Sequence, residues 1–246
     1  MGKLIAVLSG KGGTGKTSLC AGIATALADS GERVLCIDCD IGLRNLDISL
    51  GLSDSCALSF MDVCSGNYSL ENAARHPDFP TLSFLTAPAN CSCADVDEAQ
   101  FLNLLEEAKK QFQFVFLDAP AGIEAGFHLC AKHADQVILV TGADPASVRD
   151  AARAGELLEK MGKNQVRIAV NRVNEELYYA VSITVDDVMD RAGLPLLGIV
   201  PDDANVTLAA AFEKPLLRYS KRGSAASACK RIAKRIQGFP EPIPYR

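Results

Sequence analysis

A glycine-rich segment near the N-terminus, SGKGGTGKTS at residues 9–18, constrains the fold of this 246-residue chain more than any other feature. Gly10, Gly15, Lys16 and Thr17 complete the pattern GxxxxGK(S/T) of a phosphate-binding loop. A strand-like run, KLIAVLS, precedes the loop, and a helix-like run over 16–31 follows it. We therefore expect a strand, loop and helix unit that binds phosphate through backbone amides and the helix N-terminus.

The apolar pattern of the rest of the chain predicts the fold class. Strand-like runs lie at 33–40, 81–88, 112–120, 135–143, 166–173 and 194–201, and helix-like segments include 97–111 and 146–161. Continuous apolar strands indicate burial on both faces, as in a parallel sheet between helices. We expect a three-layer, doubly wound α/β sandwich of the P-loop NTPase class. A single domain is predicted over 1–238, and 239–246 is predicted to be an irregular tail because its three prolines forbid a helix.

Composition narrows the cellular compartment and the kinds of partner that we expect for the protein. The net charge of −5 and pI near 5.3 argue against binding nucleic acid by bulk electrostatics, so no direct nucleic-acid binding is expected. The nine cysteines are scattered and odd in number, which favours a reducing cytosol. No signal peptide is evident, and no apolar run approaches the roughly 20 residues that span a bilayer. A cytoplasmic protein is the expectation.

The phosphate-binding loop indicates a nucleotide with Mg²⁺. Lys16 is expected to reach the β and γ phosphates, and the Thr17 hydroxyl is expected to ligate Mg²⁺. The predicted cofactors are ATP or ADP with Mg²⁺. The loop residues predicted to bind them are Gly10, Lys11, Gly12, Gly13, Thr14, Gly15, Lys16, Thr17 and Ser18.

Three carboxylates end predicted strands. Asp38 and Asp40 close VLCIDCD and, two residues apart on a strand, point to the same side, while Asp118 closes FVFLD. Ligands of doubly wound sheets bind beyond the carboxyl ends of the strands, and a cation would relieve the repulsion between such carboxylates. The sequence therefore predicts a Mg²⁺ site beside these three carboxylates.

The loop also contains KGGxGK(S/T), with Lys11 surplus to the phosphate-binding pattern. It resembles the deviant Walker A signature of the MinD/ParA ATPases, a group of SIMIBI-type P-loop NTPases. The resemblance implies that Lys11 crosses a dimer interface to the phosphates of ATP held by a second subunit. It therefore implies a homodimer in the ATP-bound state, with Lys11 and Lys16 both catalytic. The resemblance covers about residues 3–238.

Two further segments, IDCDIGLRNLD and DAPAGIEAG, resemble the switch segments of the MinD branch of this family more than those of plasmid-partition proteins. The resemblance implies that Asp40 orients the attacking water, that Asp38 and Asp118 surround Mg²⁺ with Thr17, and that Gly122 lets the second switch move. Ala119 stands where MinD proteins usually have serine. The loops that flank adenine in the family correspond here to Asn171, Arg172, Pro201 and Asp202.

The function implied is a slow ATPase that dimerises on Mg-ATP, hydrolyses it and thereby switches the binding of protein partners, in division-site placement or related spatial organisation. Two alternatives stay open. Cys91 and Cys93 form a CxC pair of the kind that nickel-inserting relatives carry, which would suit a metal-delivery ATPase. A non-hydrolysing, nucleotide-gated scaffold is the second. His76, His128 and His133 show no ligand spacing with the cysteines.

The last helix-like stretch, SAASACKRIAKRIQG, is basic and places Ile232 and Ile236 four residues apart. By position it matches the final core helix of the fold, whose apolar face covers the sheet, and this interpretation is favoured. The alternative is a helix that seeks the inner face of the cell membrane. Peripheral membrane contact would depend on that alternative.

Overall fold

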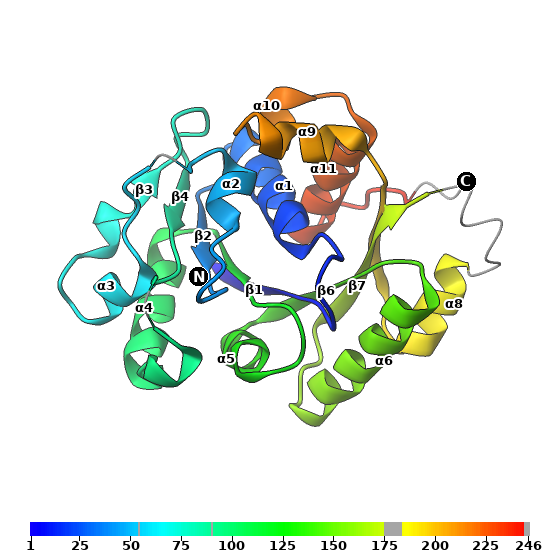
Figure 1. Cartoon of the computed structure of the whole chain (residues 1–246), viewed down its shortest axis with the longest axis horizontal. Coiled ribbons are helices and arrows are strands. Elements are labelled where there is room, and N and C mark those ends of the chain that lie inside the picture. The colour runs from blue at the N-terminus through cyan, green and yellow to red at the C-terminus, as the bar shows by residue number, and fades with distance from the viewer. Residues whose placement is uncertain (54, 90, 175–183, 244–246) are drawn as a thin grey trace.

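The computed structural model describes residues 1–53, 55–89, 91–174 and 184–243. These residues form an eight-stranded sheet in the order β3-β4-β2-β5-β1-β6-β7-β8 (Figure 1). Neighbouring strands are parallel, except that β3 pairs antiparallel with β4. The strands are β1 (Lys3–Leu8), β2 (Val34–Asp38), β3 (Ala74–Arg75), β4 (Leu82–Leu85), β5 (Phe114–Asp118), β6 (Gln136–Thr141), β7 (Val166–Val173) and β8 (Leu196–Pro201).

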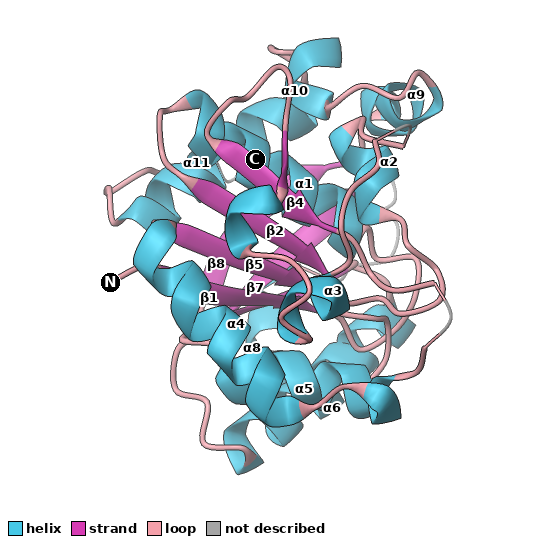
Figure 2. Ribbon diagram, turned by 90° about the vertical axis from the view of Figure 1, so that its left-hand side faces the viewer, coloured by secondary structure: helices cyan, strands magenta, loops and turns pink. Residues whose placement is uncertain are grey.

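Helices cover both faces of the sheet (Figure 2). One layer holds α1 (Lys16–Asp29), α2 (Leu46–Leu50), α9 (Ala204–Ala211), α10 (Leu216–Tyr219) and α11 (Ser224–Gln237). The other holds α3 (Phe60–Cys64), α4 (Glu98–Gln111), α5 (Ala125–His133), α6 (Pro145–Lys160) and α8 (Val185–Ala192). Two short 3₁₀ turns, Leu70–Asn72 and Cys93–Asp95, lie in the connections. The predicted three-layer α/β sandwich is confirmed.

The central strand shows why its sequence is continuously apolar. In β1, Leu4 and Leu8 belong to the core on one face of the sheet, and Ile5 and Val7 belong to the core on the other. Successive strand side chains point to opposite faces, so a strand between two helical layers needs apolar residues at every position. The two-residue edge strand β3 was not predicted, because it is too short to carry a pattern.

The C-terminal helix α11 packs on the sheet. Ile232 and Ile236 are buried, and the Ile232 side chain lies so close to Gly198 of β8 that an added Cβ there would approach it to 2.6 Å. The interpretation of this stretch as the final core helix is thus confirmed. Beyond it, 239–243 form no helix or strand, and the Arg235 guanidinium donates to the carbonyls of Glu241 and Pro242. The remainder of the predicted tail, 244–246, lies outside the described residues.

None of the helices in the described part of the chain combines the length and the apolar character needed to cross a bilayer.

Candidate nucleotide site

The phosphate-binding loop runs from the end of β1 to the start of α1, and its conformation depends on glycine. Gly13 and Gly15 have φ of 80° and 78°, in the left-handed region that costs other residues energy. Gly10 is needed for a close approach, since a Cβ there would lie 2.4 Å from the backbone oxygen of Asp150 in α6. The loop is therefore curled back on itself and packed directly on α6.

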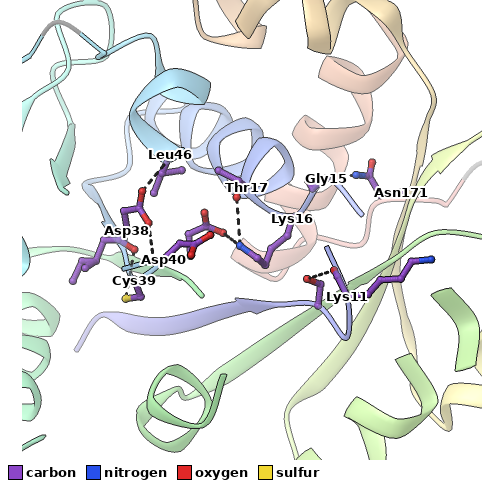
Figure 3. A network of polar contacts seen from close by, with 12 residues as sticks. Lys11, Gly15, Lys16, Thr17, Asp38, Cys39, Asp40, Leu46 and Asn171 are labelled. Atoms are coloured by element: carbon purple, nitrogen blue, oxygen red, sulfur yellow. Dashed lines mark hydrogen bonds and ion pairs between the residues drawn. The ribbon is translucent and has the colours of Figure 1, made fainter. Parts of the chain in front are cut away.

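Lys16 forms a buried ion pair with Asp118. Its Nζ lies 2.7 Å from Oδ1 of Asp118 and 3.3 Å from the Thr17 hydroxyl (Figure 3). Burial alone would lower the pKa of Lys16, but the charge and hydrogen bond of Asp118 outweigh it and raise that pKa. The second carboxylate oxygen of Asp118 is buried and has no hydrogen-bond partner among the described residues. One acceptor is thus left ready for a ligand beside the loop lysine.

Asp38 lies directly across from Asp118, because β2 and β5 pair these two residues in register. Its carboxylate accepts the backbone N–H groups of Asp40 at 2.9 Å and Leu46 at 3.2 Å (Figure 3). Burial, followed by the negative charge of Asp118, raises the pKa of Asp38 to about 7, although these two N–H groups act in the opposite direction. Asp38 therefore holds the first switch segment as well as facing Asp118.

Asp40 is half-buried and lies within the electrostatic reach of Lys16. Burial raises the pKa of its carboxyl, and the attraction of Lys16 offsets this shift only in part. A carboxylate with a raised pKa is a better proton acceptor than an exposed one. The position suits the predicted role of orienting a water molecule.

These residues fit a magnesium ion. Carboxylate and hydroxyl oxygens are the ligands that Mg²⁺ prefers, and Thr17, Asp38 and Asp118 provide them at one end of the sheet. The unpartnered Asp118 oxygen and the raised pKa of Asp38 both indicate negative charge that a bound cation would stabilise. An ion here would neutralise phosphate charge, and Thr17, Asp38 and Asp118 would hold it directly or through water.

The loop borders a cavity of about 340 Å³. Its lining includes every predicted loop residue except Gly10, together with Asp40 of the first switch and Ala121 of the second. Gly10 instead lies against α6, so its contribution is to the packing of the loop. Four lining residues of the first switch region were not singled out by the sequence and have no phosphate-binding signature: Leu43, Asn45, Ile48 and Ser49.

A second cavity of about 170 Å³ lies beside the same loop. All four residues predicted to flank adenine line it, with Gly15 and Ser18 from the loop side. Asn171 is buried, and its amide nitrogen donates to the carbonyl oxygen of Thr14 at 2.8 Å. Arg172, at φ 56°, donates to the Gly13 carbonyl at 3.2 Å and pairs with Asp202 at 3.6 Å. The two side chains thus brace the loop as well as lining the pocket.

The second switch segment touches the loop through its backbone. Gly122 has φ of 92° and donates its N–H to the Ser9 carbonyl oxygen at 3.1 Å. A Cβ on Gly12 would contact the Ala121 methyl group at 3.8 Å. This hydrogen bond joins the segment to the start of the phosphate-binding loop, where a change in phosphate occupancy would reach it.

Lys11 lies on the rim of the phosphate cavity but points away from Lys16 (Figure 3). Its ammonium group pairs with Oδ1 of Asp144 at 3.3 Å. Sequence reasoning missed Asp144, because a helix-capping Asp is common and its sequence position gives no sign of a contact with residue 11.

Among the described residues, no metal site is built around the cysteine pair. Cys91 is exposed and Cys93 is half-buried. No group of three or more His, Cys, Asp or Glu residues placed to hold a metal occurs in the part of the chain that the structure describes. His76 is buried, with Nε2 2.7 Å from the Leu50 carbonyl, and His133 pairs with Glu98.

A comparison with protein families agrees with this geometry. Residues 5–216 match the model described as the CobQ/CobB/MinD/ParA nucleotide binding domain. The chain belongs to this family. As a MinD/ParA-type protein it is a P-loop ATPase with a nucleotide-binding domain.

Individual MinD/ParA relatives cover nearly the whole chain. The septum site-determining protein MinD of Synechocystis is 36% identical, over 100% of this chain and 92% of its own length. A chain of the MinC:MinD cell division protein complex of Aquifex aeolicus superimposes with a TM-score of 0.90 at 32% identity, covering 99% of both chains. MinD of Pyrococcus horikoshii, solved with Mg-ADP, gives 0.83 at 26% identity, covering 96% of both.

Proposed function

We propose that this protein is a MinD-like ATPase that dimerises when it binds Mg-ATP and separates after hydrolysis. Through this cycle it switches the binding of protein partners, in division-site placement or related spatial organisation. The observation that carries the proposal is the arrangement of two lysines on one loop. Lys16 is buried at the phosphate cavity, whereas Lys11 lies on its rim, pointing away from it.

The loop geometry supports a role for Lys16 within the protomer and for Lys11 between protomers. Lys16 lies at the start of α1, where its ammonium can reach phosphate bound to the loop amides and the helix N-terminus. Lys11 is 35% exposed and points outward, so a second subunit closing over the cavity would reach its ammonium by displacing the exposed carboxylate of Asp144. An ammonium at a dry interface stabilises triphosphate charge far more than one in water.

Hydrolysis is assigned to Asp40. Its carboxyl lines the phosphate cavity, and its raised pKa suits it to orient and polarise a water molecule. The Asp38 carboxylate accepts hydrogen bonds from the Asp40 and Leu46 N–H groups and so fixes this segment. A change at the metal site would therefore move the first switch segment. Gly122 would pass the same change to the second switch through its hydrogen bond to Ser9.

The partners proposed are a second copy of the chain and proteins that recognise the ATP-bound dimer. The similarity to a chain of a MinC:MinD complex supports the recruitment of a protein partner. The burial of Ile232 and Ile236 leaves α11 no apolar face for lipid, so a cytoplasmic location is favoured over stable membrane contact through this helix.

The experiment that tests hydrolysis is phosphate release from ATP by the wild type and Asp40→Ala. Loss of a positioned base lowers a rate by about 10²- to 10⁴-fold, and a loss within that range is expected. Asp47→Ala is the matched control, since Asp47 lies in the same segment and lines neither cavity. Equal release by wild type and Asp40→Ala would favour the non-hydrolysing scaffold instead.

A further inference from the structure

Two separate helices shape the cavity in which the base is expected. Of the residues that line this second cavity, Val206 and Thr207 belong to α9, and Ala225 and Cys229 belong to α11. Asp203, which directly precedes α9, lines it as well. The space open to a base therefore depends on how these two helices are held relative to each other.

A single carboxylate caps both helices. Oδ1 of Asp203 accepts the backbone N–H of Asn205 in α9 at 2.9 Å, and the Asn205 side-chain amide at 2.7 Å. Oδ2 accepts the Ser224 hydroxyl at 3.0 Å and the backbone N–H of Ala225 at 3.1 Å, both in the first turn of α11. The N-cap position of α11 is occupied by Gly223, which has no side chain to accept a hydrogen bond. Asp203 thus supplies the cap that α11 lacks.

The charge of Asp203 suits this double role. A helix N-terminus carries partial positive charge, and two of them face one carboxylate here. Burial alone would raise the pKa of Asp203, but the hydrogen bonds that it accepts from the two helices outweigh burial and lower that pKa. The start of α11 also approaches the carboxylate closely, since a Cβ on Gly223 would lie 3.0 Å from Oδ2 of Asp203. The carboxylate is therefore a charged bridge between the two helices.

We propose that Asp203 is a positioning residue for the base, which holds α9 and α11 in the relative position at which their shared cavity accepts adenine. The inference rests on the proposed function and extends it to a residue that the sequence did not single out. Without the bridge, α11 loses its cap, and binding of the base must then restore the position of the helix. Phosphate binds at the loop before α1 and does not require this step. The base should therefore contribute less to affinity, while the phosphates contribute as before.

Asp203→Ser separates this role from ordinary helix capping. Serine caps a helix as well as aspartate does, so α9 keeps its cap, but its single hydroxyl oxygen cannot also accept hydrogen bonds from α11. Asp203→Ala removes both connections, and Ser224→Ala removes one donor of α11 while Asp203 stays in place. Asp97→Ser is the matched control, because Asp97 caps α4 alone, through the Ala99 and Gln100 N–H groups, and lies outside both cavities.

Two ligands separate the base from the phosphates. Calorimetry gives the dissociation constants of Mg-ADP and of Mg-pyrophosphate, and neither ligand carries the γ phosphate that the proposed dimer needs. The ratio of the pyrophosphate constant to the ADP constant measures what the adenosine part adds to affinity. Loss of a helix cap corresponds to about a fivefold change in an equilibrium. The ratio should fall about fivefold in Asp203→Ala and Asp203→Ser and by a smaller factor in Ser224→Ala, with pyrophosphate binding unchanged. Asp97→Ser should match the wild type.

A wild-type ratio in both Asp203→Ser and Ser224→Ala would overturn the inference alone, since Asp203 would then be no more than the cap of α9. An equal loss of affinity for both ligands would overturn it too, because the effect would not be specific to the base. A wild type that binds Mg-ADP no more tightly than Mg-pyrophosphate would instead contradict the nucleotide specificity of the proposed function, and the inference would fall with it.

Discussion

Lys16 and Asp118 lie 102 positions apart in the sequence, yet their side chains form a 2.7 Å ion pair that is almost entirely shielded from solvent. The pair joins the phosphate-binding loop to the carboxyl end of β5. In the proposed cycle Lys16 binds phosphate and Asp118 helps to hold Mg²⁺, so each side chain would exchange its partner for a ligand. Without ligands, each charge stabilises the other.

We predict that Asp118→Asn destabilises the nucleotide-free protein by about 3–5 kcal/mol, because it leaves a buried ammonium uncompensated. Lys16→Met should be costly for the same reason. The double variant should cost less than the sum of the two, because no unpaired charge remains. Urea unfolding of all four proteins without Mg²⁺ gives the coupling energy, and simple additivity would show that the pair does not stabilise the fold.

Gly15→Ala should destabilise the protein more than Gly13→Ala. Both positions are left-handed, which costs alanine about 1–2 kcal/mol. Only at Gly15 would the new Cβ also approach the Asn171 amide nitrogen to 2.4 Å, whereas nothing lies within 4 Å at Gly13. Urea unfolding without nucleotide measures the loss of stability in both variants. A further Asn171→Ala substitution should restore part of the stability lost in Gly15→Ala but none of that lost in Gly13→Ala. Equal losses at the two glycines would argue against the clash.

We expect the stability of the folded protein to depend on pH through His76. Burial lowers its pKa from 6.5, and Nδ1 accepts the Asp78 N–H at 3.0 Å, which a protonated ring could not do. The unfolded chain therefore takes up this proton first as the pH falls. The stabilisation is complete above about pH 6.5 and is lost below it. The free energy of unfolding between pH 7.5 and 5 should fall less steeply in His76→Gln, as about 1.4 kcal/mol corresponds to each unit of pKa difference.

His128→Gln is the control for this slope, since His128 is exposed. A wild-type slope that survives in His76→Gln would assign the acid sensitivity to other groups.

Ile232→Ala should cost about 2–5 kcal/mol, as for an isoleucine removed from a packed core. The matched change Leu208→Ala removes a side chain of the same volume that is 43% exposed, and its cost should stay near 0.5 kcal/mol. Thermal or urea unfolding distinguishes the two. A small loss at Ile232 would reopen the interpretation of α11 as a helix that seeks the membrane surface.

Much of this architecture follows from the sequence because its signals are local. The two-residue spacing of Asp38 and Asp40 and the run GxxxxGK(S/T) each depend on neighbours along the chain. A parallel sheet then brings Asp38 and Asp118 together, because strand ends of the same direction meet at one edge. The fold class and the position of the site could thus be predicted without coordinates.

The contacts of the site could not be predicted in the same way. Lys11 with Asp144, and Asn171 with Thr14, join residues more than 130 positions apart, and no spacing encodes such pairs. Asn171 was predicted only to line the base pocket, and its bracing of the loop emerges from the packing of β7 beside the loop. The leucine, asparagine, isoleucine and serine side chains that complete the cavity carry no phosphate-binding signature.

The central claim is that ATP occupancy and pairing of protomers are one equilibrium that depends on Lys11. Its most direct test is the mass in solution by light scattering, with saturating Mg²⁺ and a non-hydrolysable ATP analogue, for wild type, Lys11→Ala and the exposed control Lys160→Ala. The wild type and the control should double in mass, and Lys11→Ala should bind nucleotide as a single protomer. A wild type that stays a single protomer, or a Lys11→Ala protein that pairs as well as the wild type, would contradict the account.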